Sequence, residues 1–247
     1  MIAIIIRKEL TMLFISPLAW VILAAIQFIL SWFFFVRLDA FLEIQPQMLQ
    51  IANPPGVTEM IVSPVFALAA IVLMMIAPIL SMRLLAEERR NHTLSFLIAA
   101  PVSIATIVLG KFLALMIFFT VIVTLIALLS VSLLLGGVLD MGLIVANLLG
   151  LLFLTACFSA LGLYFSSLTA QPAIAAVASL TALLGLWMID LAASETEGWL
   201  HYFSLLKHFR HFNQGLIDTL GISYFLLFMI LFLVLTIRRL EGERLHD

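Results

Sequence analysis

The sequence predicts an all-α polytopic membrane protein with six transmembrane helices. Its 247 residues are 64% hydrophobic and only 11% charged, which leaves too little polar surface to cover a soluble core. The apolar residues are gathered in blocks, each close to the ~20 residues that a helix needs to cross a bilayer. Three segments outside these blocks also have helical patterning. We therefore expect one transmembrane domain over residues 1–247, with an interfacial helix before the first span and two short helices between spans.

The first of these segments is the N-terminus. Apolar residues recur at helical spacing through residues 2–14, and Arg7, Lys8 and Glu9 form a narrow polar face. This pattern predicts a helix lying in the membrane interface, ended by Ser16-Pro17. The following apolar run is long enough to span, so we expect an uncleaved N-terminus rather than a signal peptide.

Six spans follow, and they place both termini on the same side. They are predicted at residues 18–36, 61–82, 108–135, 142–168, 172–190 and 221–237. Between the first two, residues 38–60 contain Pro46, Pro54, Pro55 and Gly56, which predicts an irregular external loop.

The distribution of Lys and Arg predicts the orientation. With the N-terminus inside, the cytoplasmic basic residues are Arg7, Lys8, Arg83, Arg89, Arg90, Lys111, Arg238, Arg239 and Arg244. Only Arg37, Lys207 and Arg210 then lie outside. Because cytoplasmic flanks hold positive charge, both termini are predicted to be cytoplasmic.

Small residues in the fourth span predict close helix packing. Gly142, Ala146 and Gly150 recur at intervals of four, and Gly162 and Ser166 repeat the interval. We favour packing within one bundle over a seam between two copies. Residues 112–139 and 141–189 contain no charged residue, which weighs against an ion-coupled carrier, since such carriers bury charges along the substrate path.

Proline occurs at or near the ends of two spans, as Pro64, Pro78 and Pro172. A kink or a helix end is the expected role, with a gating hinge as the alternative.

The segment 199–217 is amphipathic and predicts a helix on the external leaflet. It includes His201, His208 and His211, but no carboxylate or thiol falls at a useful spacing, so no metal site is expected.

Nothing in the sequence predicts an enzyme. Gly110-Lys111 resembles the end of a phosphate loop, but Ala105 replaces its first glycine and Phe112 its hydroxyl. Lys111 is instead expected to extend toward water at the cytoplasmic end of the third span. Basic residues are scattered, which argues against nucleic-acid binding, and the single Cys157 excludes a disulfide within the chain.

The third patterned segment, residues 87–100, is predicted to be a cytoplasmic helix between the second and third spans. Glu87 and Glu88 would lie at its N-terminus, where they favour the helix dipole. Leu94, Leu97 and Ile98 form an apolar stripe that ends before Pro101. Such a helix can carry force from a docked soluble protein into the bundle, or it can rest on lipid headgroups.

The run from Glu88 to Ser103 includes Thr93-Leu94 and Pro101-Val102-Ser103, and Gly110-Lys111 follows it. Together these residues resemble the coupling-helix segment of type-2 ABC transporter permeases. In that family a Glu, a Gly-Thr pair, a Leu-Leu, a Pro-Val-Ser and a Gly-Lys recur in this order. The N-terminal Arg7-Lys8-Glu9-Leu10 and the Gly215 to Asp218 turn are also similar to that family. The branches that look nearest are the gliding-motility-associated permease and the permease for nitrous-oxide reductase maturation. Two positions depart from the pattern: His92 replaces the glycine, and Ser95 stands where an acid is common.

The resemblance implies a permease in a bacterial cytoplasmic (inner) membrane that pairs with a second copy or a sister permease above a dimer of cytoplasmic ABC ATPases. The chain itself would hold no cofactor, because ATP and Mg²⁺ bind the ATPase subunits. The ATPase-coupling residues implied are Glu87, Glu88, Arg89, Thr93, Leu94, Leu97 and Pro101. The gliding-motility branch also implies an auxiliary subunit on the periplasmic side.

The function expected from the sequence is export driven by the partner ATPases. One alternative is a mechanotransmitting subunit that acts on an external protein and exports nothing. A second alternative is an ATP-independent carrier or channel.

Overall fold

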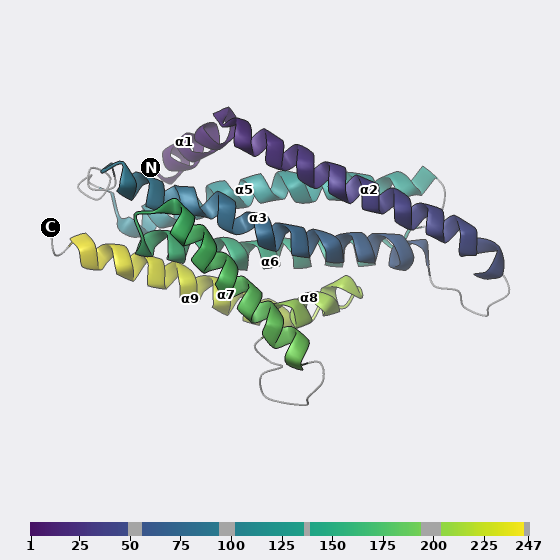
Figure 1. The fold of residues 1–247 in the computed structure, drawn as a ribbon. Helices are drawn as coiled ribbons and strands as arrows, with labels where there is room; N and C mark the ends of the chain where they lie inside the picture. The colour runs from purple at the N-terminus through teal and green to yellow at the C-terminus, as the bar shows by residue number, and fades with distance from the viewer. Residues whose placement is uncertain (49–55, 94–101, 136–138, 194–203, 245–247) are drawn as a thin grey trace.

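The computed structural model describes residues 1–48, 56–93, 102–135, 139–193 and 204–244. Within these residues every regular element is a helix, and six helices are long and apolar enough to cross a membrane. The all-α polytopic fold predicted from the sequence is confirmed. The helices lie roughly side by side in an elongated bundle, with the start of α1 and the end of α9 at the same end (Figure 1).

The elements follow the predicted order, with several different ends. They are α1 (Ile2–Ile15), α2 (Pro17–Met48), the π-helix η1 (Thr58–Val62), α3 (Ser63–Arg90), α5 (Ile104–Val131), the 3₁₀ turn η2 (Ser132–Leu135), α6 (Met141–Leu168), α7 (Pro172–Ala193), α8 (Leu205–Asn213) and α9 (Thr219–Arg244).

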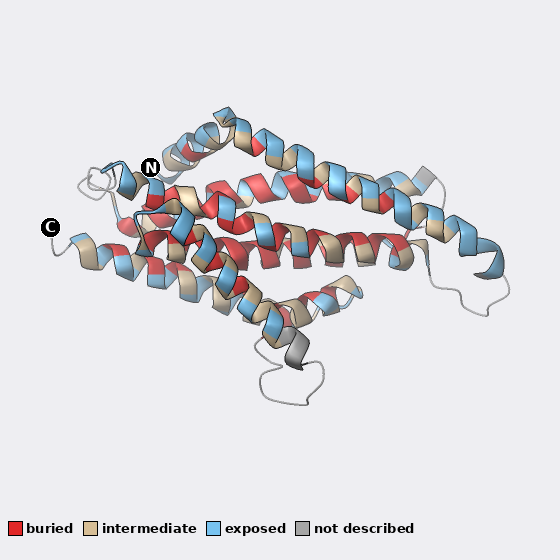
Figure 2. Cartoon of the chain, in the orientation of Figure 1, coloured by how far each residue is buried: buried red, intermediate tan, exposed pale blue. Residues whose placement is uncertain are grey.

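The core of the bundle lies along α3, α5 and α6, where buried residues are concentrated (Figure 2). In the most apolar windows of α3 and α6, 56% and 61% of residues are buried, against 22% in α2 and in α9. The exposed faces of α2 and α9 carry large apolar side chains such as Trp32, Phe35 and Leu227. Such exposed apolar faces are typical of helices that contact lipid or another membrane-embedded subunit.

Glycines of α6 allow the close packing that the small-residue spacing predicts. A Cβ at Gly150 would lie 2.6 Å from Phe212 Cβ of α8, and one at Gly162 would overlap the Ser81 side chain of α3. Both glycines therefore face helices of the same chain, which confirms packing within one bundle at these two positions.

The predicted irregular loop over residues 38–60 is wrong in its first and last parts, because α2 continues to Met48 and the π-helix η1 begins at Thr58. Leu38, Ala40, Leu42 and Glu43 favour helix, and Pro46 stands close to the helix end, where little of the helix follows it. Pro54 and Pro55 lie outside the described residues.

The predicted helix start at Glu87 is also wrong, because residues 87–90 form the last turn of α3. The sequence from Arg83 to Arg90 contains only good helix formers, so nothing stops the second span before Asn91. Residues 91–93 form a turn after α3, and residues 94–101, which include Leu94, Leu97 and Pro101, lie outside the described residues.

Pro172 begins α7, a position that needs no backbone N–H, and is one of the helix ends expected for the prolines. Pro64 lies in the first turn of α3, but η1 runs directly into that turn, so Pro64 lies within a continuous helical span. Pro78 lies inside α3, where a hinge stays a prediction. Pro17 begins α2, and the preceding Ser16 takes an extended backbone (ψ 125°). The chain therefore turns sharply between α1 and α2, which form an inverted V against the bundle (Figure 1).

In the described part of the predicted amphipathic segment 199–217, the helix is α8, Leu205–Asn213. Its apolar side chains Leu205, Phe209 and Phe212 are buried in the bundle, and Phe212 packs on Gly150 of α6. At the start of α8, Ser204 Oγ accepts a hydrogen bond from Lys207 N (3.0 Å), a standard N-cap. His201 lies outside the described residues.

Candidate functional site

The candidate site is the end of α3 and the three residues that follow it. Asn91 N donates to Glu87 O (2.9 Å), His92 N to Arg89 O (3.1 Å) and Thr93 N to Glu88 O (2.9 Å). His92 has φ +55°, so this end is a Schellman motif with His92 at the left-handed position. Thr93 Oγ1 also donates to Glu88 O (3.1 Å). The chain therefore leaves α3 in a fixed direction toward the segment 94–101.

The left-handed backbone at His92 explains why the related permeases have glycine at this position, where this chain departs from their pattern. A left-handed residue is usually glycine, because a Cβ disfavours that backbone conformation. The glycine of the family's Gly-Thr pair therefore corresponds to the end of a helix here, and the following Thr93 closes the same turn.

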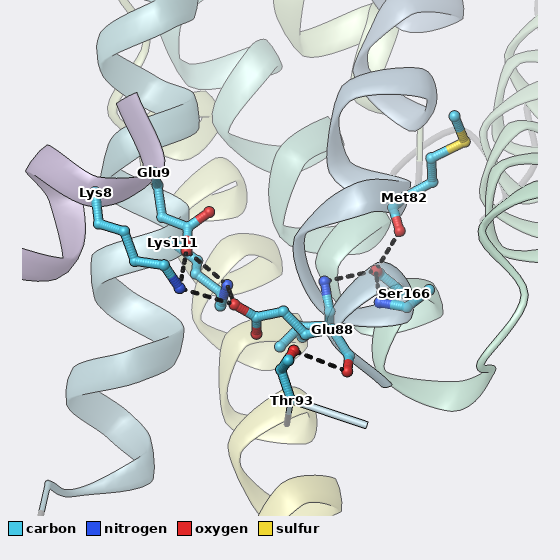
Figure 3. Close-up of polar contacts among 9 residues, drawn as sticks. Lys8, Glu9, Met82, Glu88, Thr93, Lys111 and Ser166 are labelled. Atoms are coloured by element: carbon cyan, nitrogen blue, oxygen red, sulfur yellow. Dashed lines mark hydrogen bonds and ion pairs between the residues drawn. The ribbon is translucent and has the colours of Figure 1, made fainter. Parts of the chain in front are cut away.

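A buried ion network lies one turn before this end. Lys111 Nζ lies 2.8 Å from Glu88 Oε1 and 2.8 Å from Glu9 Oε1. Lys8 Nζ lies 3.3 Å from Glu88 Oε1. The Lys111 and Glu9 side chains are 1% and 3% exposed, and that of Glu88 is 12% exposed. Figure 3 shows how the four side chains from α1, α3 and α5 converge.

The prediction that Lys111 extends into water is therefore wrong. The preceding Gly110 lets α1 lie directly on α5, since a Cβ there would come 2.8 Å from Ile5 Cγ2. With α1 covering this end of α5, Lys111 is enclosed, and Glu9 and Glu88 balance its charge. A buried ammonium is tolerated only with such partners.

A second ion pair joins α3 to α9. Arg89 Nη2 donates to both carboxylate oxygens of Glu243, each at 2.7 Å, and Arg239 lies 3.5 Å from the same carboxylate. Charge-assisted contacts this short are the stronger kind of ion pair. The last turn of α3 is therefore fixed to α9 as well as to α1 and α5.

A serine of α6 enters the backbone hydrogen bonding of α3 just before the site. Ser166 Oγ accepts from Leu85 N (3.2 Å) and Ala86 N (3.0 Å) and donates to Met82 O (2.9 Å). A side chain inserted between an N–H and the carbonyl four residues before it is a recognised cause of helix bending. Ser166 thus connects the end of α3 to the central helix α6 (Figure 3).

The predicted coupling residues are only partly brought together. Glu88, Arg89 and Thr93 lie in the contacts described above, while Glu87 is exposed on the same turn. The sequence patterns did not identify Glu9, Lys111 and Glu243 as partners of these residues. For Lys111 a signal was present, because it is a charged residue within an apolar span and such a residue needs a buried partner.

A cavity of about 430 Å³ lies beside this network, between the V of α1 and α2 and the end of α3. Its lining includes Glu88 and Arg83 at one end and apolar residues such as Leu13 and Leu80 elsewhere. Within the described residues, no group of three or more His, Cys, Asp or Glu side chains could hold a metal ion.

Comparison with known families shows which family the chain resembles over nearly its whole length. A family model described as ABC-2 family transporter protein matches residues 3–240, nearly the whole chain. A search of curated proteins found no match.

Proposed function

Because the chain belongs to the ABC-2 family of transporter proteins, we propose that it is the permease subunit of a type-2 ABC transporter that exports a substrate when partner ATPases hydrolyse ATP. The six long apolar helices among its described residues make it a multi-pass membrane protein, and its family makes it a transport component. The chain offers no catalytic role in this proposal, and ATP and Mg²⁺ belong to the ATPase subunits.

The observation that carries the proposal is the attachment of the last turn of α3. Glu88 contacts α1 and α5 through Lys8 and Lys111, and Arg89 contacts α9. A force applied where the chain leaves α3 would therefore be spread over several helices at once. This is what coupling requires, because packed elements linked by ion pairs move together rather than deform separately.

We assign the coupling role to Glu87, Glu88, Arg89 and Thr93 in the described residues, together with Leu94, Leu97 and Pro101 of the following segment. The ATPases would bind below this segment as a dimer. A second copy or a sister permease would complete the transporter, with the substrate path between the two bundles.

The proposed location is a bacterial inner membrane with both termini in the cytoplasm, as the positive-inside rule indicates. The similarity to the gliding-motility and nitrous-oxide reductase maturation branches further suggests an auxiliary subunit on the periplasmic side.

A mechanotransmitting subunit is the second candidate. The absence of charge from residues 112–139 and 141–189 favours it, since a polar substrate would need polar groups along its path. Reconstitution of the complex in vesicles separates the two: ATP-dependent accumulation of a solute supports export, and ATP hydrolysis without accumulation supports mechanotransmission. Solute or ion flux through the chain alone, without ATP, would instead indicate a carrier or channel.

Association with the ATPase tests the coupling segment. Glu88→Ala and Leu94→Asp are expected to lower the amount of ATPase that co-purifies with the chain. Arg239→Ala is the matched control, because this residue lies at the same end of the bundle with a half-exposed side chain. The assignment is wrong if both variants retain full ATPase stoichiometry.

Ser166→Ala separates coupling from association. The hydroxyl lies in the bundle and not at the ATPase surface, so association is expected to persist while the ATP-driven activity of the complex falls. Ser159→Ala is the control, because Ser159 Oγ bonds only Thr155 O of its own helix among the described contacts.

A further inference from the structure

The cavity beside the ion network has a lining that changes in polarity along one stripe of α3. Leu80, Arg83, Leu84, Glu87 and Glu88 all line it, and their spacing of three and four residues places them on one helix face. The stripe is apolar at Leu80 and charged at Glu88. Met12 and Leu13 of α1 extend the apolar part.

Both signs of charge are present at the polar end. Arg83 and the half-exposed Lys8 supply positive groups, and Glu87 and Glu88 supply negative ones. In the part of the chain that the structure describes, Arg83 has no ion pair. A ligand with one negative and one positive group therefore fits this end better than a purely anionic or purely cationic one.

Glu88 also has a hydrogen-bonding capacity that its described neighbours leave unused. Its Oε1 contacts Lys8 and Lys111, whereas its Oε2 is buried with no hydrogen-bond partner among the described residues. A buried carboxylate oxygen normally accepts a hydrogen bond from protein, water or ligand. A ligand that brings an N–H donor would satisfy it once a rotation of the Glu88 carboxylate turned this buried oxygen toward the cavity that the residue lines.

We propose that this cavity binds phosphatidylethanolamine, with the phosphate on Arg83 and Lys8, the ammonium on Glu87 and Glu88, and the acyl chains along Met12, Leu13 and Leu80. The order along α3 matches the order of groups in the lipid. Arg83 and Glu87 are four residues apart, which corresponds to roughly 6 Å at a rise of 1.5 Å per residue, and flexible side chains can span the phosphate-to-ammonium distance from there.

The amine distinguishes this lipid from its relatives. The quaternary ammonium of phosphatidylcholine has no N–H for Glu88 Oε2, and phosphatidylglycerol has no cationic group for the exposed carboxylate of Glu87. A hydrogen bond to a charged group corresponds to about tenfold in affinity. We expect about that preference for phosphatidylethanolamine over phosphatidylcholine.

The test uses the purified, delipidated full chain in detergent. Dioleoyl phosphatidylethanolamine, phosphatidylcholine and phosphatidylglycerol are titrated separately, and native mass spectrometry counts the bound lipids. Arg83→Gln should weaken all three lipids, and Glu88→Gln should remove the preference for ethanolamine. Arg90→Gln is the matched control, because Arg90 lies in the last turn of α3 with Glu87 and Glu88 but does not line this cavity.

Three results would overturn the proposal: equal binding of the ethanolamine and choline lipids, preference for phosphatidylglycerol, or equal losses in Arg83→Gln and Arg90→Gln. Titration with glycerophosphoethanolamine, which has no acyl chains, tests the apolar part of the cavity. Binding as tight as that of the whole lipid would show that the acyl chains make no contact. Should Glu88→Gln disturb folding, the comparison of the three lipids on the unaltered chain and the loss in Arg83→Gln relative to Arg90→Gln still decide the question. The inference rests on the membrane location and not on ATPase coupling, so its failure would leave the proposed function unaffected.

Discussion

Lys111 shows how a single buried charge can organise one end of the bundle. Its ammonium lies between two carboxylates, Glu9 and Glu88, from helices on either side. A buried ion pair contributes little relative to a well-packed apolar group, but removal of one partner leaves a buried charge without compensation. The residue is therefore more important for holding α1, α3 and α5 in register than for adding net stability.

Lys111→Met is accordingly expected to lower the free energy of unfolding by about 3–5 kcal/mol. Chemical or thermal unfolding of the purified chain in detergent measures this. Arg239→Met is the control, because its half-exposed pair with Glu243 is worth less than about 1 kcal/mol. Equal losses in the two variants would contradict the structural role of the buried network.

His92 is the residue for which backbone conformation decides the effect of a substitution. Since φ is +55° at this position, His92→Gly is expected to raise stability by roughly 1 kcal/mol, and His92→Val to lower it. Asn91→Gly is the control, because Asn91 has φ −86° and gains nothing from glycine. The same unfolding measurement checks all three, and a gain confined to Asn91→Gly would be inconsistent with the Schellman motif.

Of the helix contacts made at glycines, the contact between α3 and α6 is the closest. A Cβ at Gly162 would overlap Ser81 Oγ and lie 2.7 Å from Ser81 Cβ. Dispersion forces between helices in lipid depend on such proximity, because the hydrophobic effect does not drive helices together there. The α3–α6 contact therefore positions the end of α3 indirectly, by setting the distance over which Ser166 reaches Leu85 and Ala86.

Gly162→Ala is expected to destabilise the bundle by about 1–3 kcal/mol through overpacking. Gly185→Ala is the matched control on α7, where a Cβ meets nothing within 4 Å, and it should be neutral or stabilising by up to roughly 1 kcal/mol. Unfolding temperatures of the two variants give the comparison. Adding Ser81→Gly to Gly162→Ala should restore stability, and the absence of this rescue would show that Ser81 is not the obstacle.

The whole bundle places the start of α1 and the end of α9 at one end (Figure 1). Together with the basic residues near those ends, this predicts that both face the cytoplasm. The proposed contact with ATPases requires that orientation, because the end of α3 lies at the same end of the bundle as α1 and the last turns of α9.

Labelling of single cysteines with a membrane-impermeant maleimide tests this orientation. In a Cys157→Ala background, Gly242→Cys should react only in inverted vesicles and Gly56→Cys only in right-side-out vesicles. A Cβ is unobstructed at both positions. The opposite pattern would reverse the proposed orientation, and labelling of both from one side would contradict the number of spans.

The sequence by itself determined the fold class and the approximate spans. Hydropathy is a local property, since each span must bury its own backbone hydrogen bonds and cover itself with apolar side chains. The predicted ends were less accurate. At Glu87 and at residues 38–48, helix formers continue past the point where hydropathy falls, so the helix extends beyond the predicted span.

Only the tertiary structure decided which polar residues meet. Lys111 and Glu9 are 102 positions apart, Leu85 and Ser166 are 81 apart, and Arg89 and Glu243 are 154 apart. Nothing in the local pattern around Arg89 or Ser166 specifies such a partner. These contacts depend on how α1, α5, α6 and α9 pack around α3, and that packing is set by shape complementarity at positions such as Gly110 and Gly162. Local hydropathy therefore determined where the helices run, and packing decided how the end of α3 is held.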